Sequence, residues 1–407
     1  MKVLLVTDSY PPEIRSASHL MIELAEELNK RGHEVTVLTS YPAYNLDDSA
    51  QNKEYKECEN ENSIKVIRAK SLPVHKVNFI IRGIAQITLP WFFKRALKRN
   101  ASMDFEIAMV YSPPLPLAKI GGYLKKRYKT KFILNVQDIF PQNAIDLGVL
   151  NNRLLIGLFE LMERRAYRDA DIITVHSIGN HRFLLERGYP IEESKLRVLH
   201  NWIDVEAISS RTQNINFRKK LNLEGKFIYL FAGVMGPSQG LDRVVDVAQQ
   251  LKDIEDAVFL LVGDGMEKEM LEKKVNILGL KNVMFHPFVS KIDYNSLVNC
   301  IDVGIVSLTA KNKTPVVPGK ILGYMAAGKP VLAFINAESD GHTIIKEANC
   351  GLSVISSRPI EELAQAAKTL YLMGSSLKEM GLNGQKYAKK MFDKSVCVDQ
   401  IEQLFYN

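Results

Sequence analysis

Short apolar segments alternate with amphipathic helical segments along the whole chain, and this alternation occurs as two successive series. The first series opens with the apolar run Val3–Val6, followed by a segment in which Leu20, Leu24 and Leu28 recur at i+4 until Gly32 ends it. Apolar runs followed by helical repeats predict βαβ units, which build a parallel sheet with helices on both faces. We therefore expect an α/β protein with two such sheets.

The two series divide the chain into two Rossmann-like domains. The first series predicts strands at Val3–Val6, Val35–Leu38, Ile64–Ile67, Phe105–Val110, Phe132–Val136, Ile172–Val175 and Leu196–Leu199. The second predicts strands at Phe227–Ala232, Val258–Val262, Val283–Phe285, Val303–Val306, Val331–Phe334 and Leu352–Ile355.

The length of 407 residues also favours two domains, because it exceeds what one hydrophobic core organises. The polar segment Asp204–Asn222 is the natural linker, and Tyr41–Ser63 is expected to be a long surface loop. We expect domains at residues 1–204 and 205–385. A last helix within residues 386–407, around Val396–Phe405, is expected to pack back on the first domain.

The cysteines and the first residues of the chain bear on its cellular compartment. Cys58, Cys300, Cys350 and Cys397 lie far apart and form no C-x-x-C pair, which argues against a disulfide framework and a zinc site. Residues 1–25 predict a strand, a loop and an amphipathic helix, without the basic start and apolar core of a signal peptide. Both features predict a cytoplasmic protein.

Positive charge is concentrated in the first half of the chain. Residues 1–200 carry 29 Lys and Arg against 23 Asp and Glu, whereas residues 201–407 carry 24 against 23. A basic surface favours nucleic acid or an anionic membrane. Helix-turn-helix, RNP and zinc-finger patterns do not occur, so we expect no nucleic-acid partner. Peripheral contact with an anionic membrane and a merely basic solvated surface both remain open.

Two segments of the first half could carry such a membrane contact. The segment Val77–Arg99 is apolar early, contains Trp91 and ends in basic residues, but Arg82 and Pro90 interrupt it, so it does not predict a transmembrane helix. It fits either an interfacial membrane helix or a sheet-covering helix kinked at Pro90. The basic cluster Lys125–Lys131 fits either a lipid-facing patch or a solvated helix end.

Candidate ligand-binding loops follow the strands of the second domain, because loops at the carboxyl ends of parallel strands enter helices whose exposed N–H groups attract anions. The loop of residues 233–240 contains three glycines that permit close approach to a diphosphate: Gly233, Gly236 and Gly240. The turn Gly263-Asp264-Gly265 follows the next strand at the same edge and is a candidate nucleoside pocket. Glycines that only pack a strand against a helix are the alternative interpretation.

A third element, residues 315–330, predicts a loop that enters a short helix ended by Gly328. Val317, Pro318 and Gly319 suit the helix start, where first-turn amides would offer hydrogen bonds to a phosphate. Lys320 would then lie beside that anion. The alternative is a surface lysine on a short helix.

Taken together, these segments resemble the family-4 retaining glycosyltransferases, particularly the subgroup related to L-fucosamine transferases of bacterial surface polysaccharides. The resemblance covers almost the whole chain and is carried by Asp8–Glu13, Arg31–Val35, Tyr111–Pro114, Gln137–Pro141, His200–Asp204, Gly233–Gly240, Val262–Gly265 and Lys320–Pro330. It implies a GT-B fold, in which two Rossmann-like domains face each other across a cleft. It also implies a nucleotide-diphosphate sugar, commonly UDP-linked, in the second domain, the acceptor in the first, and retention at the anomeric carbon.

The chain departs from the family pattern at the expected charged positions of the donor site. Family members often carry a Glu-x7-Glu pattern, whose two positions correspond here to Pro315 and Gly323. The usual Arg and Lys of the first diphosphate loop correspond to Val234 and Gln239. Because a diphosphate leaving group needs its developing charge offset without a metal, Lys320 is expected to supply that charge.

The resemblance implies acceptor and catalytic roles in the first domain. Asp138 follows an apolar strand and is expected to position the acceptor hydroxyl or remove its proton. The alternative is an aspartate that caps the turn before Pro141. Acceptor contacts are expected from the first loop and helix start: Glu13, Arg15, Ser16 and His19. His19 alone also fits an ordinary surface position on a helix.

The string Asp169-Ala170-Asp171 imitates the D-x-D metal site of the other large glycosyltransferase fold. It lies between a helix ending near Tyr167 and the strand Ile172–Val175, which fits a turn instead. We therefore expect no metal ion and no other cofactor.

The expected function is transfer of a sugar from a nucleotide-diphosphate donor to a polyprenyl-diphosphate-linked saccharide in surface-polysaccharide synthesis. The donor is expected to be UDP-linked, with an N-acetylated amino or deoxyamino sugar as one option. The enzyme would be cytoplasmic, with peripheral contact at the inner face of the membrane left open. The alternatives are a UDP-sugar 2-epimerase and a non-catalytic nucleotide-sugar-binding protein.

Overall fold

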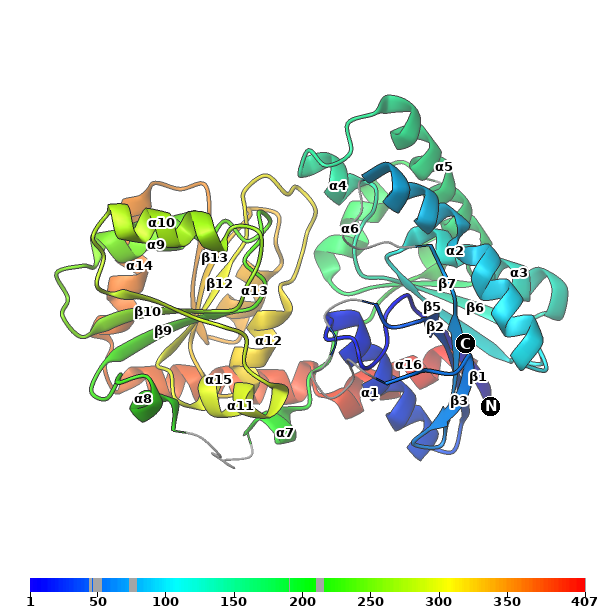
Figure 1. The fold of residues 1–407 in the computed structure, drawn as a ribbon, viewed down its shortest axis with the longest axis horizontal. Coiled ribbons are helices and arrows are strands. Elements are labelled where there is room, and N and C mark those ends of the chain that lie inside the picture. The colour runs from blue at the N-terminus through cyan, green and yellow to red at the C-terminus, as the bar shows by residue number, and fades with distance from the viewer. Residues whose placement is uncertain (44–45, 47–52, 73–78, 190, 210–215, 407) are drawn as a thin grey trace. The chain divides into compact units, whose positions relative to one another are not determined.

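The computed structural model describes the whole chain except residues 44, 45, 47–52, 73–78, 190, 210–215 and 407. It divides into two compact units (Figure 1). Unit 1 comprises Met1–Asn201 together with Cys397–Asn407, and unit 2 comprises Trp202–Val396. Every strand predicted from the sequence is present, with ends shifted by no more than two residues.

Unit 1 is built on an eight-stranded sheet of order β3-β4-β2-β1-β5-β6-β7-β8, parallel except for β3. Its strands are β1 (Lys2–Val6), β2 (Glu34–Ser40), β3 (Cys58–Glu61), β4 (Ile64–Ala69), β5 (Ile107–Ser112), β6 (Lys131–Val136), β7 (Ile172–Val175) and β8 (Leu196–Val198). Its helices are α1 (Ser16–Lys30), α2 (Phe79–Asn100), α3 (Ala118–Tyr128), α4 (Gln142–Asp146), α5 (Arg153–Asp169) and α6 (Ile178–Glu186), with short 3-10 turns at Leu115–Leu117 and Glu193–Lys195.

The strand order of unit 1 reverses direction between β1 and β5. Right-handed crossovers then place α1 on one face of the sheet and α2, α3, α5 and α6 on the other. The core agrees, because Leu4 and Val6 of β1 pack with Phe93 of α2, Leu124 of α3 and Tyr167 of α5 in one buried cluster. Loops from both halves of the sheet therefore meet at the carboxyl ends of β1 and β5.

The packing of helix α2 bears on the two interpretations of the segment Val77–Arg99 for the side of the helix that faces the sheet. Its described part covers the sheet beside β4 and β2, with Phe93 and Leu97 fully buried, and Pro90 lies inside it. The sheet-covering interpretation is confirmed for this inner side. Among the described residues, no helix combines the length and apolar character needed to cross a membrane.

Unit 2 is built on a six-stranded parallel sheet of order β11-β10-β9-β12-β13-β14. Its strands are β9 (Phe227–Ala232), β10 (Ala257–Val262), β11 (Val283–His286), β12 (Val303–Ser307), β13 (Val331–Ile335) and β14 (Gly351–Ile355). Its helices are α7 (Val205–Ser209), α8 (Phe217–Lys220), α9 (Leu241–Gln250), α10 (Lys268–Ile277), α11 (Lys291–Asn299), α12 (Gly319–Ala326), α13 (Gly341–Glu347), α14 (Ile360–Leu372) and α15 (Ser376–Met391). The strand order reverses between β9 and β12, so the switch point of this sheet lies between them.

The last helix, α16 (Lys394–Tyr406), connects the two units along the chain, and most of it belongs to unit 1. Its Glu402 accepts hydrogen bonds from Arg31 at 2.5 Å and from His33 at 2.7 Å, at the turn between α1 and β2. Ring contact between His33 and Phe405 adds to this packing. Residues 386–406 thus comprise the end of α15 and the whole of α16, with a break at Phe392 and Asp393.

Two sequence expectations about loops are wrong. The predicted loop Tyr41–Ser63 contains β3 in its last part, although residues 44, 45 and 47–52 of this loop lie outside the described residues. The sequence of β3 lacks an apolar alternation, so its antiparallel pairing with β4 was not predicted. The predicted linker Asp204–Asn222 contains α7 and α8, and Val205 and Phe217 are buried in the core of unit 2. These short helices were not predicted because few apolar residues, among them Val205, Ile208 and Phe217, attach a mostly polar segment to the core of unit 2.

Candidate functional site

The candidate site of unit 2 begins where the two glycine loops meet at the carboxyl ends of β9 and β10. A Cβ atom added to Gly263 would lie 1.9 Å from the carbonyl oxygen of Gly233, and the φ angle of Gly263 is +144°. The amide of Gly233 also donates to Val262 at 2.9 Å. The two backbones therefore touch here, which requires glycine at position 263.

A second contact between the two loops joins Gly265 and Met235. A Cβ on Gly265 would lie 2.4 Å from the carbonyl oxygen of Met235, and the Met235 amide donates to Asp264 at 2.8 Å. Gly236 is half-buried and Val234 is exposed, whereas Gly240 begins α9 as its N-cap. The structure thus brings together the two loops that the sequence singled out separately.

Lys320 joins these loops from the first turn of α12. Its Nζ donates to Gln239 Oε1 at 2.9 Å and lies 4.9 Å from the centroid of the Phe231 ring. Its Cε packs on Gly233, where an added Cβ would approach within 2.8 Å. No carboxylate among the described residues forms an ion pair with this ammonium group, and burial lowers the pKa of Lys320 to about 8.

The first turn of α12 presents backbone donors beside Lys320. Pro318 is the N-cap and offers no side-chain oxygen, so the first-turn amides have no capping side chain. Gly319 is exposed, whereas Pro318 is buried and Val317 is half-buried. A positive helix end and an uncompensated ammonium group together form a site suited to a phosphate.

Packing against β9 fixes where α12 begins. The Tyr324 hydroxyl donates to the Leu230 carbonyl at 2.9 Å, and its ring lies over Gly304 of β12, where a Cβ would meet it at 2.2 Å. The loop before α12 is tied to the loop after β13, because Asn336 Nδ2 donates to the Thr314 carbonyl at 3.2 Å. The helix start is therefore held from both sides of the sheet's switch point.

Two residues near α12 escaped the sequence analysis. A Cβ on Gly323 would lie 3.6 Å from the Tyr294 hydroxyl, so a tyrosine borders the space that a side chain at position 323 would enter. Burial raises the pKa of Tyr294 to about 12, which keeps this hydroxyl neutral. Glu338, on the loop after β13, lies 3.5 Å from Lys313 and provides a carboxylate on the loop bonded to Thr314. In the sequence, the only indication of Glu338 is its position shortly after the predicted strand Val331–Phe334.

The switch point of unit 1 carries a cluster of charged side chains. Arg15 Nη1 lies 3.1 Å from Asp8 Oδ2 and 3.7 Å from Glu13 Oε2. Glu13 is itself buried, and its carboxylate accepts hydrogen bonds from Ser9 Oγ at 2.8 Å and from the Ala43 amide at 2.9 Å. Burial raises the pKa of Asp8, while Arg15 acts in the opposite direction. These contacts give Glu13 a role in holding the first loop.

Asp138 lies at the carboxyl end of β6, near the same cluster. Burial raises the pKa of its carboxyl group, and the Asp138 charge is one reason, after burial, why the pKa of Tyr111 is raised. The Asp138 carboxylate makes no hydrogen bond or ion pair with any described residue; only its backbone carbonyl accepts, from Phe140 at 2.9 Å. The turn before Pro141 is therefore not capped by this side chain.

The remaining predicted acceptor residues lie at the start of α1. Ser16 is its first residue and is exposed, and the His19 amide donates to Arg15 at 3.1 Å. Arg15 is the N-cap, without a side-chain bond to the helix. Within unit 1 the structure thus groups Arg15, Ser16 and Asp138 along one edge of the sheet.

The D-x-D string comprises Asp169, the last residue of α5, and the two residues that connect α5 to β7, in agreement with the turn interpretation. Asp169 pairs with Lys126 at 3.1 Å, and Asp171 pairs with Lys125 at 2.7 Å and accepts from the Phe132 amide at 2.9 Å. Both carboxylates therefore serve the packing of α3 and β6. Across the part of the chain that the structure describes, no three His, Cys, Asp or Glu side chains gather as a metal site.

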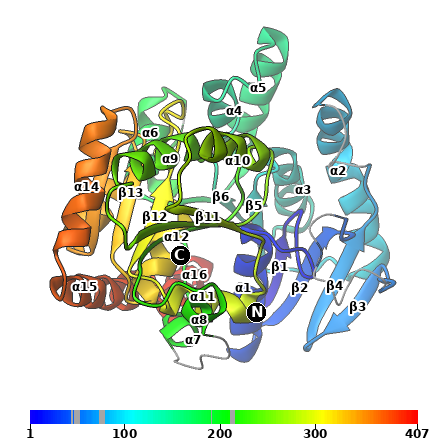
Figure 2. The same cartoon turned by 60° about the vertical axis from the view of Figure 1, so that its left-hand side comes forward.

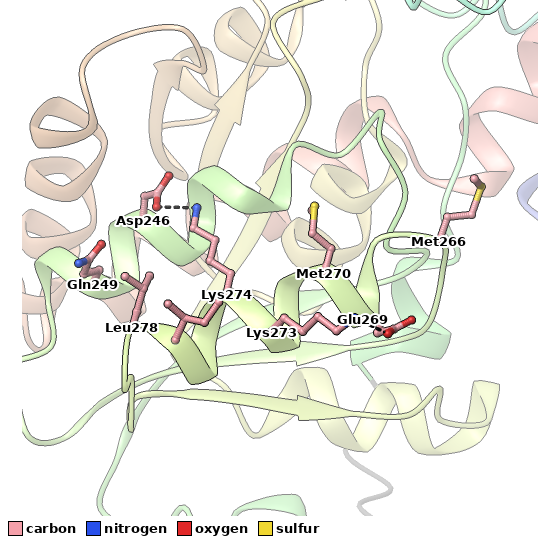
Figure 3. A pocket seen from close by; sticks show the side chains of 9 residues that line it. Asp246, Gln249, Met266, Glu269, Met270, Lys273, Lys274 and Leu278 are labelled. Atoms are coloured by element: carbon pink, nitrogen blue, oxygen red, sulfur yellow. Dashed lines mark hydrogen bonds and ion pairs between the residues drawn. The ribbon is translucent and has the colours of Figure 1, made fainter.

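A shallow depression of about 630 Å³ lies on the outer side of α9 and α10 (Figure 3). Its lining consists of Asp246, Gln249, Met266, Glu269, Met270, Lys273, Lys274, Ile277 and Leu278. Apart from Met266, which follows the Gly263–Gly265 turn, these residues lie on α9, on α10 or just after α10, away from the strand ends that carry the glycine loops. Lys274, the nearest cation to Asp246, is already paired with it at 2.6 Å. The depression therefore does not belong to the candidate site.

We expect Gly263→Ala to destabilise unit 2 by about 3 kcal/mol or more, because the new Cβ would overlap the Gly233 carbonyl and the φ angle is strained for alanine. Thermal unfolding measures this change. Gly279→Ala is the matched control, since Gly279 also has a positive φ of +61° but open space around it. The control should cost about 1 kcal/mol. Equal losses in the two variants would contradict a loop-to-loop contact at Gly263.

Both units of the chain are similar to known glycosyltransferase domains. The family model described as "Glycosyl transferase 4-like domain" matches residues 21–202, and the one described as "Glycosyl transferases group 1" matches residues 213–387. The chain is 25% identical to WcaI of Escherichia coli K12, assigned as a glycosyl transferase of colanic acid biosynthesis, over 98% of each protein.

Solved structures resemble the chain over its full length. A sucrose-phosphate synthase from Thermosynechococcus elongatus superposes with a TM-score of 0.80 at 16% identity, covering 100% of this chain and 98% of that one. Anabaena HepE, solved in complex with UDP, superposes with a TM-score of 0.75 at 17% identity over 100% of both chains. At these identities the likeness is one of fold.

Proposed function

Because this chain is a glycosyltransferase with the GT-B fold, we propose that it transfers a sugar from a UDP-linked donor held by unit 2 to a lipid-linked saccharide acceptor held by unit 1. The observation that carries the donor assignment is Lys320, an ammonium group without a carboxylate partner among the described residues, beside two glycine loops and a helix start. Anabaena HepE, which has the same fold, was solved with UDP.

The proposed chemistry places opposite charges at the two ends of the breaking bond. The sugar carbon becomes oxocarbenium-like as the diphosphate leaves, so positive charge is needed at the phosphates. In this proposal, Lys320 and the amides of the α12 first turn supply the positive charge, and no step uses a metal ion. Transfer proceeds with retention at the anomeric carbon, as in the family that the sequence resembles.

On the acceptor side, Asp138 orients the acceptor hydroxyl and accepts its proton. A carboxylate without a structural partner among the described residues is free for this task, and burial has already raised its pKa toward that of a usable base. Arg15 and Ser16 at the α1 start bind the acceptor. A diphosphate-linked acceptor suits this edge, because the first-turn amides of α1 lack a capping side chain.

The decisive assay incubates the protein with UDP- and GDP-linked sugars and short polyprenyl-diphosphate-linked acceptors, and measures nucleotide release. One UDP-sugar should be consumed only when acceptor is present, and the product should keep the anomeric configuration of the donor. Absence of turnover with every donor, although UDP binds in calorimetry, would show a non-catalytic binding protein. Scrambling at C2 without acceptor would show an epimerase.

The pKa of Lys320 predicts an alkaline limit to activity. The ammonium form is the active one, and because burial lowers its pKa to about 8, kcat/KM should approach its maximum well below pH 8, be half-maximal near pH 8 and fall about tenfold per pH unit well above it. Bound diphosphate favours the charged lysine, so the limb in kcat should lie at higher pH. A pH-rate series measures both limbs. In Lys320→Arg, whose guanidinium stays charged, any remaining activity should lose this limb; an unchanged limb would assign it to another group.

A further inference from the structure

The solvent-facing side of α5 is apolar where a surface helix is normally polar. Leu154 is 85% exposed, Leu158 41% and Leu161 45%, and they follow one another at i, i+4 and i+7 on one face of the helix. The opposite face is the one that packs on the sheet, through Phe159 and Glu163. These leucines are therefore not core residues left partly uncovered.

Cations continue the same row toward the end of α5. Arg165 and Arg168, at i+11 and i+14 from Leu154, are both exposed. The outward row of α5 is therefore apolar near the start of the helix and basic near its end.

Helix α2 repeats this pattern with the same spacing. Ile84 is 52% exposed and Trp91, at i+7, is 59% exposed. Arg95 and Lys98 follow at i+11 and i+14, and both are exposed. Two helices from different parts of the chain therefore carry equivalent apolar and basic levels.

Helix α3 lies between the other two and contacts both of them (Figures 1 and 2). Its outward row consists of Lys119, Tyr123 and Lys126, and the Nζ of Lys98 lies 5.6 Å from the Tyr123 ring. We call the combined surface the α2–α3–α5 face; its members are Ile84, Trp91, Arg95, Lys98, Lys119, Tyr123, Lys126, Leu154, Leu158, Leu161, Arg165 and Arg168.

The apolar level of this face lies toward the carboxyl edge of the sheet. Each of the three helices connects parallel strands, so each runs back from the carboxyl edge and has its first turns there. Ile84 and Leu154 belong to those first turns, and Asp138 lies at the same edge. The apolar end of the face is therefore on the side where the acceptor is proposed to bind.

We propose that the α2–α3–α5 face docks on an anionic lipid bilayer, with its apolar level at the acyl boundary and its cations at the lipid phosphates. Aromatic and leucine side chains beside Lys and Arg suit that boundary, and anionic lipid complements the charge. Docking would bring the carboxyl edge of unit 1 to a membrane-embedded acceptor. Only this purpose of the docking rests on the proposed function, which the inference deepens.

Charge distinguishes this occupant from a second copy of the chain. Arg95, Lys98 and Arg165 form no ion pair with a described residue, and Lys126 and Arg168 share one partner, Asp169. Two copies meeting through this face would bring these cations together without compensation, which opposes self-association. A surface of phosphates compensates all of them.

Trp91 allows the proposal to be tested with the whole protein and without any substrate. The chain has two tryptophans, and Trp202 is 4% exposed, so a change in fluorescence on adding vesicles reports Trp91. We expect a blue shift, and co-flotation of the protein, with phosphatidylglycerol-containing vesicles but not with pure phosphatidylcholine vesicles. Salt should weaken the binding, because exposed charges are screened.

Two sets of variants separate the apolar from the basic contribution. Leu154→Ser with Leu158→Ser should weaken vesicle binding about tenfold or more, since apolar burial drives insertion. Arg95→Glu with Arg165→Glu should weaken it at least about 25-fold, from roughly fivefold for each cation removed. The matched control on unit 2 combines Leu372→Ser, at a leucine that is 67% exposed, with Lys378→Glu, at an exposed lysine, and should bind as the unchanged protein does.

The outcomes decide the proposal independently of catalysis. Loss of binding in both α2–α3–α5 variants, with the control intact and melting temperatures unchanged, supports it. Failure of the unchanged protein to bind anionic vesicles, or equal binding by all variants, overturns it. Light scattering that shows a dimer dissociated by Leu154→Ser with Leu158→Ser also overturns it, in favour of a second copy. Nucleotide release with a water-soluble acceptor analogue should be the same in all these variants. A failure of sugar transfer is therefore distinguishable from a failure of vesicle binding.

Discussion

Lys320→Ala is expected to lower kcat/KM for transfer about 1,000-fold, or about 4 kcal/mol of transition-state stabilisation, while the melting temperature stays close to that of the unchanged protein. The physical reason is that the lysine ammonium group has Gln239 as its hydrogen-bond partner and no carboxylate among the described residues, so its charge is available to a leaving diphosphate. Burial of this charge does not favour the folded protein without a ligand, as its lowered pKa indicates. Initial rates of nucleotide release and a thermal scan measure the two quantities.

Two further substitutions make the Lys320 result specific. Lys320→Met keeps the apolar stem that packs on Gly233 and the Phe231 ring but removes the charge, and it should be as inactive as the alanine variant. Lys311→Ala, at an exposed lysine on the preceding loop, should keep nearly full activity. Activity in Lys320→Met close to that of the unchanged protein would falsify an electrostatic role.

Asp138→Asn is expected to lower kcat about 1,000-fold with little change in KM for the donor. Asparagine has the shape of aspartate but cannot accept the acceptor's proton. Because the Asp138 carboxylate has no partner among the described residues and its pKa is raised by burial, removing the charge should leave the melting temperature unchanged or raise it. Single-turnover kinetics with saturating donor separate the chemical step from binding.

Asp8→Asn is the matched comparison for Asp138→Asn, since both carboxyl groups lie at the same edge and burial raises the pKa of both. Asp8, however, pairs with Arg15 at 3.1 Å. Its removal leaves Arg15 with a weaker partner, so this variant should lose stability as well as activity. If Asp138→Asn instead lost stability and kept its kcat, Asp138 would be a structural residue.

Most of the architecture could be predicted from the sequence because buried parallel strands are nearly continuous apolar runs. Val3–Val6 and Phe227–Ala232 needed no tertiary information, and the glycine loops after the strands of unit 2 marked one edge of its sheet. The approach of Gly263 to Gly233 was not predictable, since it depends on how two neighbouring loops pack. The availability of Asp138 and Lys320 was likewise a matter of which neighbours approach them.

The elements that the sequence did not reveal are those whose pattern is set by distant partners. Strand β3 contains Cys58 and three polar residues, so only its pairing with β4 identifies it. Glu13 stays a predicted acceptor contact, but the hydrogen bonds that Ser9 and Ala43 donate to its carboxylate could not be predicted from its place in the first loop. The exposed leucines of α5 have the period of a core stripe, and only the structure shows that they lie on the side opposite the core.

The return of residues 397–407 to unit 1 has a consequence for synthesis on the ribosome. Unit 1 is assembled from two stretches separated by the whole of unit 2, and Cys397, Val398 and Ile401 are fully buried. The first 201 residues are made before the whole of unit 2, so Arg31 and His33 lack their α16 partner until Glu402 has emerged. A nascent chain stalled at Val396 would hold all of unit 2 and an incomplete unit 1, although unit 1 was started first.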